Sequence, residues 1–210
     1  MEISYSHETK RKIHEIGEWL EVGTVNGFGR QFAGKDTELE PLSVAYDTPI
    51  IGGGDILRNV EIPDDIKAIM ESGALIPSDS YEAIVLPYLS QPAFEGRPLL
   101  LSAVGRMNGE QTGVMQATAA AGHTIKLVID FQITREESQF RLATTPKRGR
   151  ADDTIDGLNK RLDFFDEYTV PVLGFYEQQG LLITVDAMPE ANIVFNNFIN
   201  LAHDRATGKG

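Results

Sequence analysis

The stretch Gly29-Arg30-Gln31-Phe32-Ala33-Gly34-Lys35-Asp36-Thr37 contains two glycines five residues apart, then a lysine, and a threonine two residues after it. A phosphate-binding loop needs glycines, because its backbone N–H groups converge on the anion at distances that a Cβ would obstruct. Lys35 would bring positive charge to the outer phosphates, and Thr37 a hydroxyl to a metal ion or a phosphate. The P-loop pattern places Ser or Thr directly after the lysine, where this chain has Asp36. A glycine-rich surface turn is therefore the alternative interpretation.

The composition is that of an ordinary globular protein with excess negative charge. The 210 residues include 31 acidic and 19 basic side chains, so the net charge is −12. This charge opposes broad contact with nucleic acid or an anionic membrane, and we expect neither partner. The absence of cysteine excludes disulfides, thiol catalysis and Cys-ligated zinc. Charged residues throughout the first 20 positions do not fit a secretory signal, so we expect a cytoplasmic protein.

Segments with helical periodicity alternate with short apolar runs along the whole chain. The expected helices are 7–20, 36–46, one that opens at 56–58 with Asp55 as its cap, 63–71, 79–90, 107–121, 154–179 and 189–203. The expected strands are 24–28, 48–55 (a short strand that runs into a flexible turn), 98–104, 125–133 and 181–186. The run 98–104 is apolar on both faces, as a central parallel strand should be, and Pro171 should kink the helix 154–179. The alternation predicts an α/β protein, a three-layer sandwich around a mostly parallel sheet. Ligands of such sheets bind beyond the carboxyl ends of the strands, where the loop 29–37 would lie.

Further short motifs follow the loop in a defined order. They are Gly53-Gly54-Asp55-Ile56-Leu57-Arg58, Ser72-Gly73-Ala74-Leu75-Ile76-Pro77, Gly105-Arg106, Arg141-Leu142, Gly149-Arg150-Ala151-Asp152-Asp153, Lys160-Arg161-Leu162 and Thr169-Val170-Pro171. In this order and spacing the chain, from about 24 to 203, resembles the adenylate kinase family of nucleoside monophosphate kinases in its short-lid form. The resemblance implies one domain, 1–210, with a fold like that of the P-loop-containing nucleoside triphosphate hydrolases. It would comprise an N-terminal helix at 1–22, a monophosphate-binding segment at about 56–90 and a short lid at about 142–151.

The resemblance also implies roles for individual residues. The ATP-binding residues would be Gly29, Ala33, Gly34, Lys35, Asp36, Thr37 and Arg141. The monophosphate-binding residues would be Gly53, Gly54, Arg58, Ile76, Arg106, Glu110, Arg150 and Arg161. The catalytic residues would be Lys35, Arg106, Arg141, Arg150 and Arg161, and Thr37 would be a ligand of the Mg²⁺ ion that accompanies ATP. Phosphoryl transfer requires positioning and positive charge, which such a set supplies, although any one arginine alone could form a surface ion pair.

The chain departs from the pattern of this family at several of these positions. Ser102 stands where an acid that helps to order magnesium is expected, and Asp36 where a glycine follows the lysine. Gly53 replaces a threonine, and Glu110 replaces a glutamine that reads the base. The second arginine at the lid entrance is missing near Thr145.

The resemblance predicts a monomeric enzyme that converts ATP and AMP into two ADP. Gly53 and Glu110 favour an alternative acceptor, a pyrimidine or deoxynucleoside monophosphate. Ser102 leaves a third possibility, a nucleotide-binding protein with weakened catalysis. Retention of the arginines argues against this third possibility, because a protein that only binds nucleotides does not need groups that stabilise the transferring charge.

Overall fold

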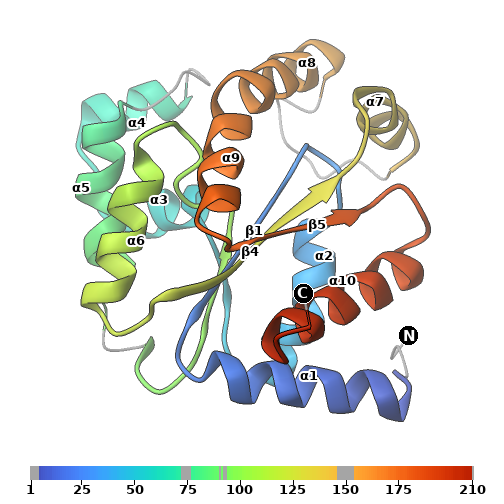
Figure 1. The fold of residues 1–210 in the computed structure, drawn as a ribbon. Helices are drawn as coiled ribbons and strands as arrows, with labels where there is room; N and C mark the ends of the chain where they lie inside the picture. The colour runs from blue at the N-terminus through green and yellow to red at the C-terminus, as the bar shows by residue number, and fades with distance from the viewer. Residues whose placement is uncertain (1–4, 72–76, 90, 92–93, 146–153, 210) are drawn as a thin grey trace.

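The computed structural model describes residues 5–71, 77–89, 91, 94–145 and 154–209. Its five strands form one sheet in the order β2-β3-β1-β4-β5, and every pairing is parallel. The strands are β1 (Thr24–Gly29), β2 (Ile50–Gly52), β3 (Leu99–Ser102), β4 (Ile125–Gln132) and β5 (Leu182–Asp186). Helices cover both faces of this sheet, so the predicted α/β sandwich is confirmed (Figure 1).

The helices alternate with the strands along the chain. They are α1 (His7–Leu20), α2 (Lys35–Ala45), α3 (Gly53–Asn59), α4 (Asp64–Glu71), α5 (Ser78–Leu89), α6 (Glu110–Ala120), α7 (Arg135–Thr144), α8 (Ile155–Phe164), the π-helical segment η2 (Phe165–Thr169), α9 (Val170–Gln178) and α10 (Ala191–Ala206). None of the helices within the described ranges is long and apolar enough to cross a membrane.

Two apolar cores lie on the two faces of the sheet. In β4, Leu127 and Ile129 pack with α1, α2 and α10, whereas Val128 packs with α5, α6 and α9. Successive side chains of a strand point to opposite faces. A strand that is buried on both faces therefore contains consecutive apolar residues, as β4 does at Leu127-Val128-Ile129.

The middle of the sheet is β1, not the run 98–104 that we expected to be the central strand. That run forms β3, an inner strand between β2 and β1. The sequence signal of β1 is weak because the strand contains the fully buried polar side chains of Thr24 and Asn26. It also contains Gly27, where a Cβ would lie 3.0 Å from a methyl group of Leu39 on α2. Glycine at this position thus allows α2 to pack closely on β1.

The expected helix 154–179 is divided into α8, η2 and α9. The irregular part precedes Pro171: the N–H of Val170 donates to the carbonyl of Phe165, five residues earlier. Proline has no N–H to donate to the carbonyl of Glu167, so the regular α-helical bond cannot form there. The ten-residue helix α7 was not expected at all from the sequence.

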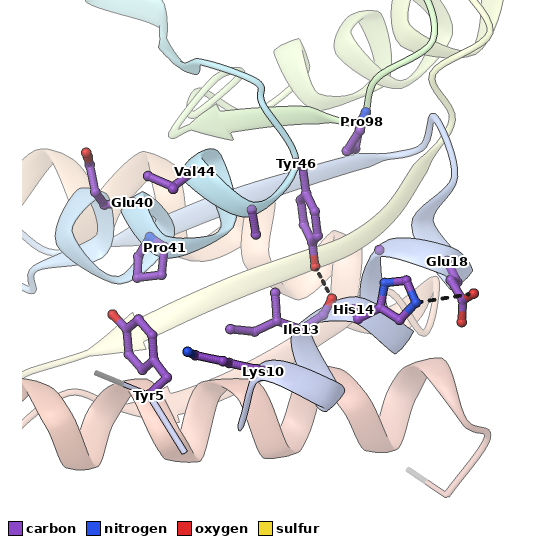
Figure 2. A pocket seen from close by; sticks show the side chains of 12 residues that line it. Tyr5, Lys10, Ile13, His14, Glu18, Glu40, Pro41, Val44, Tyr46 and Pro98 are labelled. Carbon is purple, nitrogen blue, oxygen red and sulfur yellow. Dashed lines mark hydrogen bonds and ion pairs between the residues drawn. The ribbon is translucent and has the colours of Figure 1, made fainter. Parts of the chain in front are cut away.

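Helix α1 lies against α10 and α2. Lys12 donates a hydrogen bond to the side-chain oxygen of Asn200 on α10 (2.8 Å). The Glu15 carboxylate forms a hydrogen bond with Nε2 of His203 on the same helix (2.6 Å). A groove of about 800 Å³ runs between α1 and the carboxyl half of α2, where the Tyr46 hydroxyl donates to the Ile13 carbonyl (Figure 2). None of the residues that line the groove is a site residue implied by the sequence motifs.

Candidate functional site

The candidate site lies at the carboxyl ends of β1 and β3. From β1 the chain passes through α2 to β2 on one side, and from β3 it passes through α6 to β4 on the other side. This reversal of direction leaves a crevice beyond neighbouring strands, where ligands of open parallel sheets bind. Gly27 of β1 is paired with Ser102 of β3, so the loops that follow these two residues meet at the crevice.

The loop after β1 has the backbone that its two glycines predict. A Cβ on Gly29 would lie 2.7 Å from the Phe131 carbonyl oxygen and 3.0 Å from the Cβ of Ala33. Gly34 caps α2 in a left-handed conformation, with φ of 85°. The first N–H groups of α2 have no partner within the helix and lie at its positive end, which favours a bound phosphate.

A compact polar group stands at the start of α2. The ammonium of Lys35 lies 3.1 Å from the carboxylate of Asp36, and the hydroxyl of Ser102 donates to the same carboxylate oxygen at 2.6 Å. Thr37 is exposed in the first turn. The structure therefore brings two of the departures from the family pattern, Asp36 at the start of α2 and Ser102 at the end of β3, into direct contact.

Arg141 is held on α7, beside the loop. Its guanidinium forms an ion pair with Glu137 (2.7 Å) and donates to the carbonyls of Phe32 (3.1 Å) and Ala187 (2.8 Å). Arg141 thus lies next to the expected ATP phosphates, but its nitrogens are engaged with protein groups. Its role in catalysis stays a prediction.

A buried carboxyl group lies under the loop. Glu38, in the first turn of α2, is 4% exposed. Burial raises the pKa of this carboxyl to about 7, although the positive charge of Arg141 acts in the opposite direction. The group therefore titrates close to neutral pH.

The side of the crevice where the sequence motifs place the acceptor is formed by α3, α5 and the loop after β3. A Cβ on Gly53 would lie 2.5 Å from the hydroxyl oxygen of Tyr81, so a larger residue at the start of α3 would have to displace the Tyr81 side chain. That hydroxyl accepts a hydrogen bond from the N–H of Gly105 (3.3 Å). Burial raises the pKa of Tyr81 to about 12, so the phenol is neutral near pH 7. Gly54 is exposed in the same turn of α3.

Arg106 and Glu110 follow β3. The guanidinium of Arg106 lies 5.1 Å from the centre of the Phe164 ring, at the end of the helix that carries Arg161. Glu110 is buried; its carboxylate accepts from the N–H of Met107 (3.1 Å) and the hydroxyl of Ser78 (3.3 Å). Burial raises the pKa of Glu110, and these hydrogen bonds oppose the shift. The structure thus places Arg106 against the helix that carries Arg161, and Glu110 begins α6 four residues further along the chain.

Three of the expected site residues cannot be placed in this crevice. Ile76 and Arg150 lie outside the described residues, as do Asp152 and Asp153. Arg58 belongs to α3, but only its backbone is described. Of the expected lid, 142–151, the described part ends at residue 145.

Asn26 is a site residue that the sequence analysis did not identify. Its side-chain amide donates to the Val104 carbonyl (2.8 Å) and accepts from the Val104 N–H (3.4 Å). These bonds hold the turn at Ala103, whose φ is 51°, and thereby the loop that carries Arg106. The sequence feature that could have identified Asn26 is a large polar residue in the middle of a strand expected to be buried, where such a residue needs hydrogen-bond partners.

Comparison with known proteins gives relatives along most of the chain. An adenylate kinase from Mycobacteroides abscessus is 32% identical over 169 residues, which cover 78% of this chain and 90% of the relative. One from Mycolicibacterium smegmatis is 33% identical over 171 residues, with the same two coverages of 78% and 90%. One from Parvibaculum lavamentivorans is 31% identical over 166 residues, covering 74% and 80%. No protein-family model matches the chain. The chain belongs to the adenylate kinase family, whose members are phosphotransferases with a phosphate group as acceptor.

Proposed function

We propose that this protein transfers the γ-phosphoryl group of ATP to AMP and releases two ADP, acting as a monomer. The observation that carries the proposal is the position of the loop Gly29–Thr37, which follows β1 and faces the Gly105-Arg106 turn after β3. The loop Gly29–Thr37 suits the triphosphate of ATP, and the Gly105-Arg106 turn presents an arginine to the phosphate of the acceptor. Such a reaction would serve nucleotide biosynthesis in the cytoplasm.

The triphosphate side relies on backbone N–H groups and Lys35. Magnesium, when bound with ATP, neutralises charge on the outer phosphates. Proteins commonly bind this ion through one or two carboxylates together with the phosphates of the nucleotide. The exposed hydroxyl of Thr37 and the carboxylate of Asp36 fit that small donor set. Asp36 is also fixed by Ser102, so its carboxylate has a defined position.

The acceptor side relies on arginines. We assign Arg58 and Arg106 to the monophosphate, because a planar guanidinium can donate two parallel hydrogen bonds to one phosphate. We assign Arg141, Arg150 and Arg161 to the charge that develops on the transferring group, where cationic donors have their largest effect on rate.

A second acceptor class is favoured by Glu110. An ionised carboxylate only accepts hydrogen bonds, whereas a glutamine amide both donates and accepts. Once its oxygens are released from Ser78 and Met107, an ionised Glu110 would therefore suit a base edge that presents donors and disfavour an edge that presents an acceptor. A pyrimidine or deoxynucleoside monophosphate remains the alternative substrate, and a binding protein with weakened turnover remains the third.

One assay distinguishes these candidates. Purified protein is incubated with MgATP and each nucleoside or deoxynucleoside monophosphate in turn, and the formation of diphosphate is measured. The fastest acceptor identifies the substrate, and binding without any diphosphate would support the third candidate.

The P-loop assignment predicts the effect of removing Lys35. Lys35→Ala should lower kcat by more than it weakens ATP binding, because the lysine stabilises charge that grows during transfer. The loss of one charge-assisted hydrogen bond is worth about 1.5–3 kcal/mol, or roughly 10- to 100-fold in rate. Lys10→Ala, at an exposed position on α1, is the control. A Lys35→Ala rate within about threefold of the control would contradict the assignment.

A further inference from the structure

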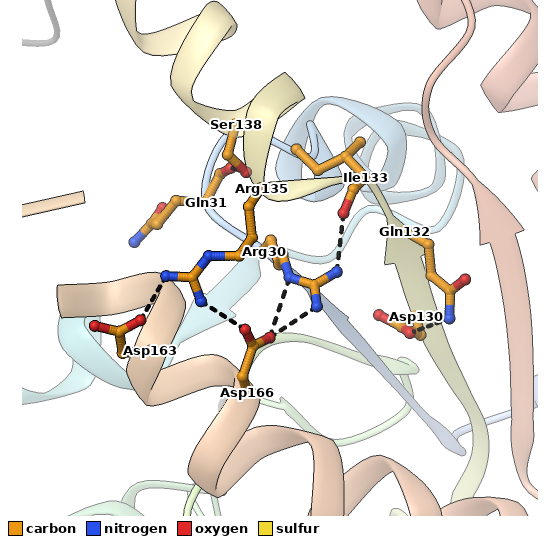
Figure 3. A network of polar contacts seen from close by, with 9 residues as sticks. All are labelled: Arg30, Gln31, Asp130, Gln132, Ile133, Arg135, Ser138, Asp163 and Asp166. Carbon is orange, nitrogen blue, oxygen red and sulfur yellow. Dashed lines mark hydrogen bonds and ion pairs between the residues drawn. The ribbon is translucent and has the colours of Figure 1, made fainter. Parts of the chain in front are cut away.

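A polar network connects the phosphate-binding loop to the helix that carries Arg161. Arg30, the first residue after β1, donates through Nε (3.2 Å) and Nη2 (2.7 Å) to one oxygen of Asp166. Arg135, the first residue of α7, donates to the other oxygen of Asp166 (2.7 Å) and also to Asp163. Figure 3 shows both guanidinium groups pointing toward Asp166. Asp166 thus bridges two elements that follow neighbouring strands, β1 and β4.

The geometry of Arg30 differs from that of an ordinary surface ion pair. Its third nitrogen, Nη1, donates to the Ile133 carbonyl (2.9 Å), and its guanidinium carbon lies 5.3 Å from the centre of the Phe165 ring. Exposed ion pairs typically contribute about 0–1 kcal/mol, because two long side chains must be ordered in water. Here the arginine is fixed on several sides, and its side chain is only 26% exposed. Burial raises the pKa of Asp166, but the hydrogen bonds from Arg30 and Arg135 outweigh this effect and keep the pKa below its usual value.

A second route joins the same two parts of the molecule through α7. The loop carbonyls of Gln31 and Phe32 accept hydrogen bonds from Ser138 (2.8 Å) and Arg141 (3.1 Å), both on α7. At its far side α7 contacts α8, where Gln139 donates to Asn159 (2.8 Å). The loop and α8 are therefore held by α7 as well as by the direct Arg30–Asp166 contact.

The helical segment that receives these contacts also carries Arg161. Asp163 and Asp166 lie two and five residues after Arg161, at the end of α8 and in η2. π-helical turns are rare and occur frequently at functional sites. Here the π turn directly precedes Pro171, and it contains Asp166.

We propose that Asp166 is a positioning residue for phosphoryl transfer: it anchors α8 to Arg30 and Arg135, and so fixes Arg161 relative to Lys35. The proposal rests on the function proposed above. It also assigns Arg30 to this anchor rather than to the phosphates, although Arg30 lies within the phosphate-binding loop. A displacement of about 1 Å in a group that stabilises the transferring charge can cost about 100-fold in rate, without contact between the displaced anchor and the substrate.

The test compares Asp166→Asn with Asp156→Asn, an exposed aspartate in the first turn of the same α8. We expect Asp166→Asn to lower kcat at least tenfold and to change the KM of either nucleotide less than threefold. Amide hydrogen exchange of residues 155–164 should become faster in Asp166→Asn and stay unchanged in Asp156→Asn. Equal kcat values for the two variants would overturn the proposal. If the wild type itself forms no diphosphate, the proposed function fails instead, and hydrogen exchange still tests the anchor.

Arg30→Met provides an independent test of the anchor. If Arg30 acts through Asp166, this variant should lower kcat as Asp166→Asn does, and the double variant should show no further loss. An increase of more than tenfold in the KM of ATP with unchanged kcat would make Arg30 a phosphate ligand and overturn the assignment. If Asp166→Asn does not fold, Asp163→Asn takes its place, since it removes only one of the two Arg135 contacts. This variant should give a smaller decrease of kcat in the same direction, and no decrease would count against the network.

Discussion

Single residues of the loop Gly29–Thr37 combine backbone strain with fixed hydrogen bonds. Phe32 has a φ of 68°, in the left-handed region that bulky side chains rarely adopt. Such a conformation costs about 1–3 kcal/mol and persists where neighbouring groups hold it. Here the Phe32 carbonyl accepts a hydrogen bond from Arg141, and the preceding carbonyl, of Gln31, accepts one from Ser138. These hydrogen bonds thus hold the loop in a conformation that a bulky residue rarely adopts.

Asp36 is the residue for which the structure gives the clearest test of magnesium use. A carboxylate in the first turn of a helix gains about 0.3–1 kcal/mol from the helix dipole, which could be its whole contribution. Its contact with Ser102 suggests a second role, in which Asp36 orders the water shell of the ion in place of the expected acid. Asp36→Gly should then raise the magnesium concentration required for half-maximal ATP binding and turnover by about tenfold.

The double variant Asp36→Gly/Ser102→Asp is the corresponding control. It returns a carboxylate to the same position from β3 and should restore the magnesium requirement. Calorimetric titration of ATP at several magnesium concentrations measures the effect without relying on turnover. An unchanged magnesium dependence, with only a lower Tm, would leave the helix dipole as the sufficient explanation.

At the scale of elements, the strands and helices with a clear apolar pattern could be predicted from the sequence. β4 and α10 are examples, because their buried residues recur at the spacing of a strand or a helix. Helix α7 has no such stripe: Ser138 is its only fully buried residue, and Phe140 is 61% exposed. The helix is held instead by polar bonds to the phosphate-binding loop and to α8, which leave no periodic signal.

The same limit applies to the site. Gly29, Gly34 and Lys35 are close in sequence, so their spacing predicts a phosphate-binding loop. Arg30 and Asp166 are 136 residues apart, and only the arrangement of β1 and η2 brings them together. Contacts of this kind depend on tertiary packing and cannot be predicted from local spacing.

Helix α2 provides a prediction about pH. The Glu38 carboxyl has a pKa of about 7 in the folded protein, above its ordinary value of 4.5, so folding favours the protonated form. The contribution of the Glu38 carboxyl to the free energy of unfolding is therefore fully present below about pH 4.5, and it is lost as the pH rises through 7. Between pH 5 and pH 8 the wild type should lose about 2 kcal/mol of unfolding free energy relative to Glu38→Gln. Urea unfolding at both pH values measures this difference.

Glu40→Gln, on the same helix but exposed, is the matched control for this experiment. It should follow the wild type at both pH values. If Glu38→Gln and Glu40→Gln showed the same dependence on pH as the wild type, the carboxyl of Glu38 would have to be ionised throughout this range, stabilised by Arg141.

At the scale of the whole molecule, the candidate site lies at the carboxyl ends of β1 and β3, away from helix α1, which packs on the core formed with α2 and α10. The net charge is −12, yet the loops after β1 and β3 carry Lys35 and Arg106, and Arg141 of α7 donates to the Phe32 carbonyl of the first loop. Two of these charges are paired within the protein, Lys35 with Asp36 and Arg141 with Glu137. Helix α1 carries none of the candidate site residues. It precedes the part of the chain that resembles the kinases, and it packs on the core around α2 and α10.

This separation predicts that α1 contributes to stability and not to chemistry. Ile16 of α1 is fully buried in the core with α2 and α10. Ile16→Ala leaves a cavity and should lower the unfolding free energy by about 2–4 kcal/mol, which lowers Tm by roughly 10 °C in a protein of this size. Val44→Ala, at a residue of α2 that is 75% exposed, should leave Tm nearly unchanged. At temperatures well below both Tm values, kcat and KM should be equal in the two variants, because the site lies at the other end of α2. A decrease of kcat in Ile16→Ala under these conditions would show instead that α1 acts on the phosphate-binding loop through α2.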